Sequence, residues 1–271
     1  MRVAIVGYGR MGREIEQVLR SRGHEAALLV DPAFEPGTGT ASAAGSSGSA
    51  AGGSPGPRFE RELSARALEG CDVAIEFSLA DAVTTNVEHY AAAGVPVVIG
   101  TTGWLAELPA IEERVRQAGS ALVYGSNFSI GANLFFRLAK HAGTLVREIE
   151  EYDLMIHEVH HRGKKDSPSG TALTLAEAVL DAVPRKKRIE TARLDRAPEP
   201  EELHVSSTRG GSVPGTHTLF LDSDADTIEV RHQARSRGGF ALGAVRAAEW
   251  IVNRQGVFTV EQFINDLLEG R

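Results

Sequence analysis

The sequence predicts an α/β protein with a doubly wound parallel sheet in its first part and an α+β domain with a mainly antiparallel sheet in its second. Two observations support this prediction. Short apolar runs alternate with helical segments as far as Gly125, which is typical of parallel strands that are buried on both faces. After Asn127 the strands instead alternate apolar and charged residues and are joined by short loops, as in a sheet with one exposed face.

The first part begins with a strand, Arg2–Val6, and a helix, Arg10–Arg20, which Gly23 ends. The segments that follow repeat this order, which favours parallel strands joined by crossover helices. The further predicted strands are Ala26–Val30, Val73–Phe77, Pro96–Ile99 and Ala121–Tyr124, and the predicted helices are Ala82–Ala93 and Leu108–Ala118.

One stretch, Pro36–Pro57, interrupts this order. It consists of Gly, Ser, Ala, Thr and Pro and contains no large apolar side chain. Such a segment cannot bury enough surface to offset the entropy lost on ordering. We therefore expect a flexible surface insertion, spanning about 26 Å root-mean-square if it behaves as a Gly-rich coil.

The second part is predicted from a different periodicity. A helix, Phe128–Ala142, precedes four strands, and two helices close the chain. Thr259 and Gln262 have the spacing of a capping box at the last helix. The predicted strands are Ile149–Ile156, Val205–Thr208, Thr216–Leu221 and Thr227–His232, and the closing helices are Ala241–Val252 and Val260–Leu268.

Composition limits the classes of partner and compartment. The net charge of −7 argues against nucleic acid, because phosphate binding needs a positive excess. Cys71 is the single cysteine, so no internal disulfide can form, which suits a reducing cytoplasm. No stretch approaches the ~18 apolar residues of a membrane span, and the first residues run directly into a strand without a signal-peptide pattern. We expect a cytoplasmic protein with neither a membrane nor a nucleic-acid partner.

The run Val3–Gly12 contains Gly-x-Gly-x-x-Gly between the first strand and the first helix. Its glycines allow a tight turn, close approach of a pyrophosphate and close packing of helix on strand, with the phosphates at the helix N-terminus. The motif alone is weak, but this placement is the one that dinucleotide binding requires. The predicted cofactor residues here are Gly7, Tyr8, Gly9, Arg10, Met11 and Gly12.

Asp31 ends the next strand, where an acid would bind the adenosine ribose hydroxyls. The alternative is a turn or capping residue. Pro32 follows it, so no adjacent cation receives a 2′-phosphate, which favours NADH over NADPH unless Arg10 or Arg13 reaches that phosphate. Two later loops also follow strands, at the edge where doubly wound sheets bind ligands, although ordinary turns would have the same spacing. Their candidate residues are Gly100, Thr101, Thr102, Gly125, Ser126, Asn127 and Phe128.

The segment His157–Thr171 is the richest in chemical groups. His160, His161 and Lys164 are cationic or can donate protons. Ser169, Gly170 and Thr171 offer hydroxyls and free amides where a helix begins, which suits a carboxylate. This combination suits an anionic substrate and a step that needs a proton beside a hydride.

A zinc site is the competing interpretation of the same segment, since His157–His161 satisfies H-E-x-x-H. That chemistry needs both histidines on one face of a helix. The alternating pattern predicts a strand, on which positions four apart are roughly 13 Å apart and cannot share one zinc ion. We therefore expect no metal; solvent-facing histidines at a strand end are the remaining alternative.

Taken together, the motifs resemble the dihydrodipicolinate reductase family, in the family's order and over nearly the whole chain. The matching runs are Gly7–Arg13, Gly100–Gly103, Asn127–Asn133, His160–Lys164, Asp166–Thr171, Ser236–Arg237 and Gly243–Arg246. Pro36–Pro57 departs from the family pattern, and the glycine loop is one residue shorter than in some relatives.

This resemblance implies reduction of a cyclic dicarboxylate, the dehydration product of hydroxytetrahydrodipicolinate, to tetrahydrodipicolinate. It implies that His160 and Lys164 carry the proton transfer, with Lys164 as the donor. It further implies that the carboxylates are held by His161, Ser169, Gly170, Thr171 and Arg237.

The resemblance also implies a domain division and an assembly. Residues 1–126 and 238–271 would form the dinucleotide-binding domain, and residues 127–237 the substrate-binding and oligomerisation domain. The second sheet would join subunits into a homotetramer. A non-catalytic dinucleotide-binding sensor on the same fold is the alternative function, because fold alone does not decide activity.

Overall fold

The computed structural model describes residues 1–34 and 56–271. The described chain forms two compact units, residues 1–129 with 240–271 and residues 130–239. The predicted insertion Pro36–Pro57 falls almost entirely outside the described residues. Within the described ranges, no helix is long and apolar enough to span a bilayer.

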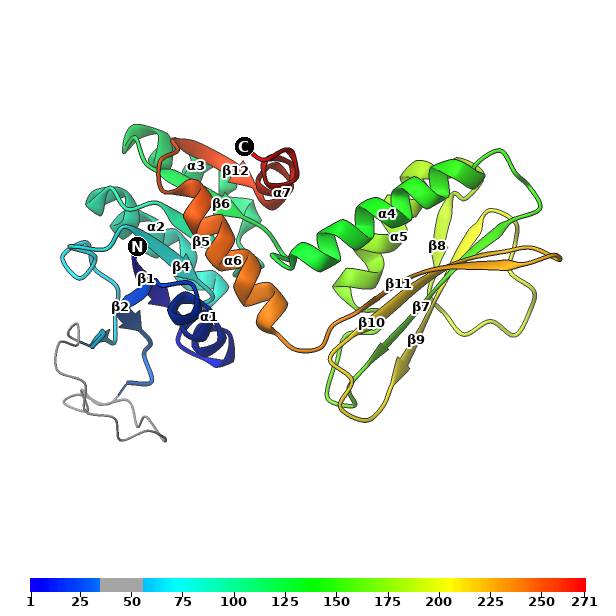
Figure 1. Cartoon of the computed structure of the whole chain (residues 1–271), viewed down its shortest axis with the longest axis horizontal. Helices are drawn as coiled ribbons and strands as arrows, with labels where there is room; N and C mark the ends of the chain where they lie inside the picture. The colour runs from blue at the N-terminus through cyan, green and yellow to red at the C-terminus, as the bar shows by residue number, and fades with distance from the viewer. Residues whose placement is uncertain (35–55) are drawn as a thin grey trace. The chain divides into compact units, whose positions relative to one another are not determined.

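The first unit is built on a seven-stranded parallel sheet in the order β12-β6-β5-β4-β1-β2-β3 (Figure 1). Two edge strands, β3 and β12, were not predicted, because these partly exposed segments lack the continuous apolar run that marks the equally short buried strands β4, β5 and β6. The strand order reverses at β1, and doubly wound sheets bind ligands at such a reversal. The strands are β1 (Arg2–Val6), β2 (Glu25–Val30), β3 (Arg58–Glu60), β4 (Val73–Glu76), β5 (Val97–Ile99), β6 (Ala121–Tyr124) and β12 (Gly256–Thr259).

Helices cover this sheet on both sides (Figure 1). Arg22 at the end of α1 (Arg10–Ser21) forms an ion pair with Glu249 of α6 (Gly238–Ile251) at 2.7 Å. On the other side, α2 and α3 pack against the main apolar cluster. The predicted capping box is confirmed at the start of α7. The remaining helical segments are α2 (Ala80–Ala93), η1 (Leu105–Glu107), α3 (Leu108–Gln117) and α7 (Val260–Glu269).

The second unit has a five-stranded sheet in the order β11-β10-β7-β9-β8, covered on one face by α4 and α5 (Figure 1). The prediction of a mainly antiparallel sheet needs correction, because β7 with β9 and β8 with β9 are parallel. For β7 with β9 the crossover includes α5, whereas β8 and β9 are joined by the long loop of residues 191–201; both connections are long enough for parallel pairing. The elements are α4 (Ile130–Val146), β7 (Asp153–His160), α5 (Gly170–Ala182), β8 (Arg188–Glu190), β9 (Glu202–Arg209), β10 (Thr216–Asp222) and β11 (Thr227–Gln233).

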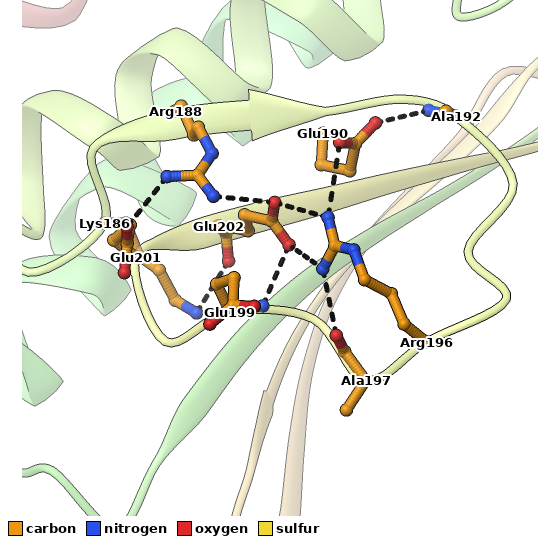
Figure 2. A network of polar contacts seen from close by, with 9 residues as sticks. All are labelled: Lys186, Arg188, Glu190, Ala192, Arg196, Ala197, Glu199, Glu201 and Glu202. Atoms are coloured by element: carbon orange, nitrogen blue, oxygen red, sulfur yellow. Dashed lines mark hydrogen bonds and ion pairs between the residues drawn. The ribbon is translucent and has the colours of Figure 1, made fainter.

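A polar network fixes the loop between β8 and β9 (Figure 2). Glu202 is almost fully buried and binds the guanidinium groups of Arg188 at 2.9 Å and Arg196 at 2.8 Å. The hydrogen bond from Arg196, aided by the backbone amide of Glu199 and by Arg188, lowers the pKa of Glu202 to about 2. The parallel edge of this sheet is thus held by a buried carboxylate with two cationic partners.

Candidate active site

The loop after β1 needs glycine at two of its three motif positions. Gly7 has a φ of +88°, and a Cβ there would lie 2.2 Å from the Phe77 carbonyl oxygen. A Cβ on Gly12 would lie 2.5 Å from the Gly7 carbonyl oxygen. At Gly9, by contrast, no atom of the described residues lies within 4 Å of the Cβ position. Since Gly9 directly precedes α1, this open space lies beside the free amides of a helix N-terminus.

Asp31 follows β2 and binds the glycine loop. One carboxylate oxygen accepts the Tyr8 amide at 2.8 Å, and the other accepts the Ala33 amide at 2.9 Å. The turn role that was one alternative for Asp31 is therefore present. An ionised carboxylate has about four acceptor sites, so these two bonds leave capacity for ribose hydroxyls.

Two cations stand near the same loop. Arg10 and Arg13 are exposed in the first turn of α1, and the Arg13 guanidinium lies 5.9 Å from the centre of the Tyr8 ring. Burial, together with a hydrogen bond to Glu16, raises the pKa of Tyr8 to about 12. The Tyr8 side chain is therefore neutral, and its ring makes a cation–π contact with Arg13.

The loops after β5 and β6 lie at the same edge of the sheet, because the carboxyl ends of parallel strands share an edge. A Cβ on Gly100 would lie 2.2 Å from the Phe77 ring, and the Thr101 hydroxyl accepts the Ser78 amide at 2.9 Å. A Cβ on Gly125 would lie 2.5 Å from the Val260 side chain. The predicted residues Gly100–Thr102 and Gly125–Phe128 therefore lie at the same sheet edge as the glycine loop.

Glu76, at the end of β4, was not predicted as a site residue. It is fully buried and accepts hydrogen bonds from Ser78 at 2.5 Å, Asn86 at 2.8 Å and Tyr90 at 3.0 Å. Burial raises the pKa of Glu76. The available signal was a lone acid within the apolar run Val73–Phe77. Its partners show that it joins the end of β4 to α2.

In the second unit, the strand predicted at Ile149–Ile156 is found four residues later, as β7 (Asp153–His160), which includes His157. His157 bonds to Ser206 at 2.9 Å, whereas Glu158 and His160 are buried on the opposite face. The histidines of H-E-x-x-H are His157, which lies on a strand, and His161, which follows that strand. They do not share a helix face, which rules out the zincin arrangement.

Glu158 is the centre of a buried polar cluster. One oxygen accepts Arg209 at 2.7 Å and the Ser169 amide at 3.2 Å, and the other is hydrogen bonded to Nδ1 of His160. Burial raises the pKa of Glu158, but the hydrogen bonds with Arg209 and His160 outweigh it and lower the pKa to about 2. Glu158 is therefore ionised at neutral pH.

His217 joins this cluster from β10. It lies opposite Glu158 in the antiparallel register, and its Nε2 is 3.1 Å from the Ser169 hydroxyl. Ser169 is the N-cap of α5, as predicted, and accepts the Ala172 amide at 3.1 Å. Burial, and next the charge of His160, lower the pKa of His217 to about 4. His217 is therefore neutral near pH 7.

Lys164 lies on the loop between β7 and α5. It forms an ion pair with Asp166 at 2.9 Å, and about a quarter of its side chain is exposed. Arg209 donates to the Asp166 carbonyl at 2.7 Å, which ties this loop to β9. The structure thus gathers His160, Ser169 and the loop that carries Lys164, with Gly170 and Thr171 in the first turn of α5.

The other two predicted substrate residues, His161 and Arg237, have no described side-chain contact with the Glu158 cluster. The His161 amide donates to the Val213 carbonyl at 2.8 Å. Arg237 is exposed in the segment between β11 and α6, and the described contacts do not join it to the Glu158 cluster.

Comparison with known proteins identifies the family. Residues 1–128 match the family model of the dihydrodipicolinate reductase N-terminus, and residues 131–264 match that of its C-terminus. A 4-hydroxy-tetrahydrodipicolinate reductase of Christiangramia forsetii is 36% identical over 269 residues, which is 99% of this chain and 100% of the relative. The chain belongs to the dihydrodipicolinate reductase family.

Further relatives agree with this assignment. A 4-hydroxy-tetrahydrodipicolinate reductase of Archaeoglobus fulgidus is 39% identical over 278 residues, covering 97% of this chain and 100% of the relative. A dipicolinate-bound dihydrodipicolinate reductase of a Paenisporosarcina species has a TM-score of 0.71 at 20% identity, covering 96% of this chain and 97% of that one, and so shares the fold. The family and the oxidoreductase class predicted from the sequence are confirmed.

The buried cluster also contains three side chains of the types that bind metal ions. Ligand atoms of Glu158, His160 and His217 all lie within 4.8 Å of one another, a spacing that a metal ion could use. Arg209 already neutralises Glu158 at 2.7 Å, and a metal ion would have to compete with that guanidinium. The donor set therefore fits a hydrogen-bonded cluster better than a metal centre.

Three members of the cluster, Glu158, Arg209 and His217, were not predicted as site residues. For Glu158 a signal existed, since period-two alternation places it on the same face as His160. Arg209 and His217 lie on other strands, and only strand pairing brings them to Glu158.

Proposed function

We propose that this chain is a 4-hydroxy-tetrahydrodipicolinate reductase of the diaminopimelate pathway to lysine. It uses NADH or NADPH to reduce the cyclic dicarboxylic dehydration product of hydroxytetrahydrodipicolinate to tetrahydrodipicolinate. The observation that carries the proposal is the buried cluster of Glu158, His160 and Ser169, tied to the Lys164 loop, in a chain that relatives of this name match almost end to end. A sensor would need only the glycine loop.

The reaction adds a hydride and a proton to one double bond. When bound, the nicotinamide cofactor supplies the hydride. Lys164 donates the proton from its ammonium group, which the ion pair with Asp166 at 2.9 Å holds in place. His160 is the second proton-transfer group, with its Nδ1 held by Glu158.

The substrate carboxylates are held at the start of α5 by Ser169, Gly170 and Thr171. This 13-residue helix presents free backbone amides there, and no described atom lies within 4 Å of the Cβ position at Gly170. His161 and Arg237 add positive or hydrogen-bonding groups. Side-chain and amide donors together suit two carboxylates.

The dinucleotide is held at the carboxyl edge of the parallel sheet. The open space at Gly9, beside the N-terminus of α1, fits a pyrophosphate, and Asp31 fits the ribose hydroxyls. The carboxylate of Asp31 repels a 2′-phosphate, so we propose NADH as the preferred cofactor, with no metal. The cofactor residues are Gly7, Tyr8, Gly9, Arg10, Met11, Gly12, Asp31, Gly100, Thr101, Thr102, Gly125, Ser126, Asn127 and Phe128.

We further propose that residues 1–126 and 238–271 bind the cofactor, and that residues 127–237 bind substrate and join subunits into a homotetramer. The second sheet supports this assembly, because Met155 is 41% exposed on the face that α4 and α5 do not cover. The enzyme would be cytoplasmic, with no membrane or nucleic-acid partner. Light scattering at micromolar concentration should give the mass of four chains; a monomer would reject the assembly.

A direct assay tests the activity. NADH oxidation is followed at 340 nm with substrate made in place by the preceding synthase, and omission of the synthase provides the blank. We expect turnover that depends on the synthase and is inhibited by dipicolinate. NADH binding without any turnover would support the sensor and overturn the proposed function.

A further inference from the structure

Glu158 and Arg209 form contacts that the proposed chemistry leaves unused. We propose that both are positioning residues for the proton-transfer groups. Glu158 fixes His160 as the Nδ1–H tautomer, with Nε2 as its working nitrogen, and Arg209 holds Glu158 and the Lys164 loop together. This inference rests on the proposed function, because His160 and Lys164 are its proton-transfer residues.

The tautomer follows from the state of Glu158. An ionised carboxylate can only accept hydrogen bonds, so the Nδ1 atom bonded to it must carry the proton. Nε2 is then the nitrogen that can accept or pass on a proton. The residue that faces it on the approach to β10 is Gly215, where a Cβ would lie 2.9 Å from Nε2. A side chain at that position would crowd the working nitrogen.

Arg209 joins the two proton-transfer groups through one atom. Its Nη2 donates to Glu158 Oε1 at 2.7 Å and to the Asp166 carbonyl at 2.7 Å. Asp166 in turn pairs with Lys164 at 2.9 Å. The parallel register of β7 and β9 fixes this placement, because Arg209 lies opposite His160. A fully buried carboxylate without such a cation would tend to take up a proton and lose its acceptor role.

The groups facing His160 give the direction of the expected change. They are Glu158 on its own strand, Arg209 on β9, His217 on β10 and Lys164 on the following loop. Burial lowers the pKa of His160, Lys164 and Arg209 lower it further, and Glu158 raises it. Removing the negative charge of Glu158 should therefore lower the pKa of His160 again.

The first test needs no turnover. Long-range ¹H–¹⁵N correlation spectra of the full-length protein report the tautomer and titration of each imidazole, and His160→Asn identifies the His160 signal. We expect Nδ1–H in the parent. In Glu158→Gln we expect loss of that preference and a lower titration midpoint. Glu177→Gln, the same change at an exposed site on α5, is the matched control and should leave the His160 signal unchanged.

The second test is kinetic. Loss of tautomer control by a buried acid costs up to ~10⁴ in kcat in histidine-dependent catalysis. We expect Glu158→Gln to lower kcat by about 10²-fold or more, with a smaller change in KM, and to move the acidic limb of the pH profile to lower pH. Arg209→Lys keeps the charge on a side chain that is one atom shorter, so its ammonium should not reach Glu158 and the Asp166 carbonyl together. Its kcat should therefore lie between those of the parent and Glu158→Gln.

The outcomes separate this inference from the proposed function. A parent that gives no turnover overturns the function, whereas the spectra still decide the role of Glu158. A parental tautomer, titration and pH profile in Glu158→Gln would overturn the inference, even if thermal stability falls. If Glu158→Gln does not fold, Arg209→Lys decides: a parental kcat and pH profile, in protein that binds NADH normally, rejects the positioning role.

Discussion

Replacing Gly9 by alanine separates the folding role of the glycine loop from its binding role. Gly9 has an extended conformation with φ −78° and ψ −150°, and its Cβ position has no described neighbour within 4 Å. Loss of glycine flexibility should stabilise the fold by about 0.4–1 kcal/mol, and alanine at an N-cap should cost a similar amount. We therefore expect a change in melting temperature of no more than about 4 °C.

Binding should respond differently. A methyl group at Gly9 would occupy the space into which we place the pyrophosphate. Displacing the phosphate by the width of a methyl group should cost at least one charged hydrogen bond, about 1.5–3 kcal/mol. That loss corresponds to roughly a 10–100-fold rise in the Kd for NADH.

Calorimetric titration with NADH, beside a thermal melt, measures both effects. Gly210→Ala is the matched control, because its Cβ position is also open and it lies in the second unit. Its NADH affinity should equal that of the parent. If Gly9→Ala binds NADH as tightly as the parent, the pyrophosphate does not lie on this loop and the assignment of Gly7–Gly12 is wrong.

Three further predictions concern chemistry, cofactor choice and pH. Lys164→Ala should lower kcat by ~10²–10⁴ while NADH still binds. His161→Ala and Thr171→Ala should instead mainly raise KM. Both effects are measured by steady-state kinetics, and a parental kcat in Lys164→Ala would show that Lys164 is not the proton donor. NADH should bind more tightly than NADPH, and a calorimetric preference for NADPH would instead favour contacts from Arg10 or Arg13. The pKa of His217 falls from 6.5 to about 4 on folding, so the unfolded chain binds more protons between these values. The free energy of unfolding is therefore unaffected by His217 above pH 6.5 and falls by roughly 3 kcal/mol as the pH drops from 6.5 toward 4. Denaturant titrations of His217→Gln should show a flatter stability profile in that window, and a slope equal to the parent's would contradict the assigned burial.

Most of the first unit could be predicted from the sequence because its signals are local. A strand covered on both faces is apolar at nearly every position, as Leu28–Val30 and Val73–Ile75 are. The glycine loop is also a local pattern, since its turn and its helix lie within ten residues of each other. Glu76 was missed because one acid in an apolar run does not reveal that Asn86 and Tyr90 of α2 satisfy it.

The second sheet shows where local signals end. The alternation in β7 predicted a strand and its two faces correctly, but it cannot say whether a neighbouring strand runs parallel or antiparallel. The helix α5 was expected after Ser169. A helix between two strands allows them to pair in parallel, but the parallel pairing of β7 with β9 was not predicted.

The sequence by itself determined the α/β fold, the dinucleotide motif and the family. Through the family resemblance it also indicated His160 and Lys164 as the candidate proton-transfer pair. Only the tertiary structure decided what surrounds them. Arg209 is 51 residues from Glu158 in the chain, and both it and His217 reach Glu158 through strand register. A slip of one residue in either pairing would turn these side chains to the opposite face of the sheet, because side chains alternate with a period of two. Register depends on the packing of the whole unit, and no single segment of the sequence specifies it.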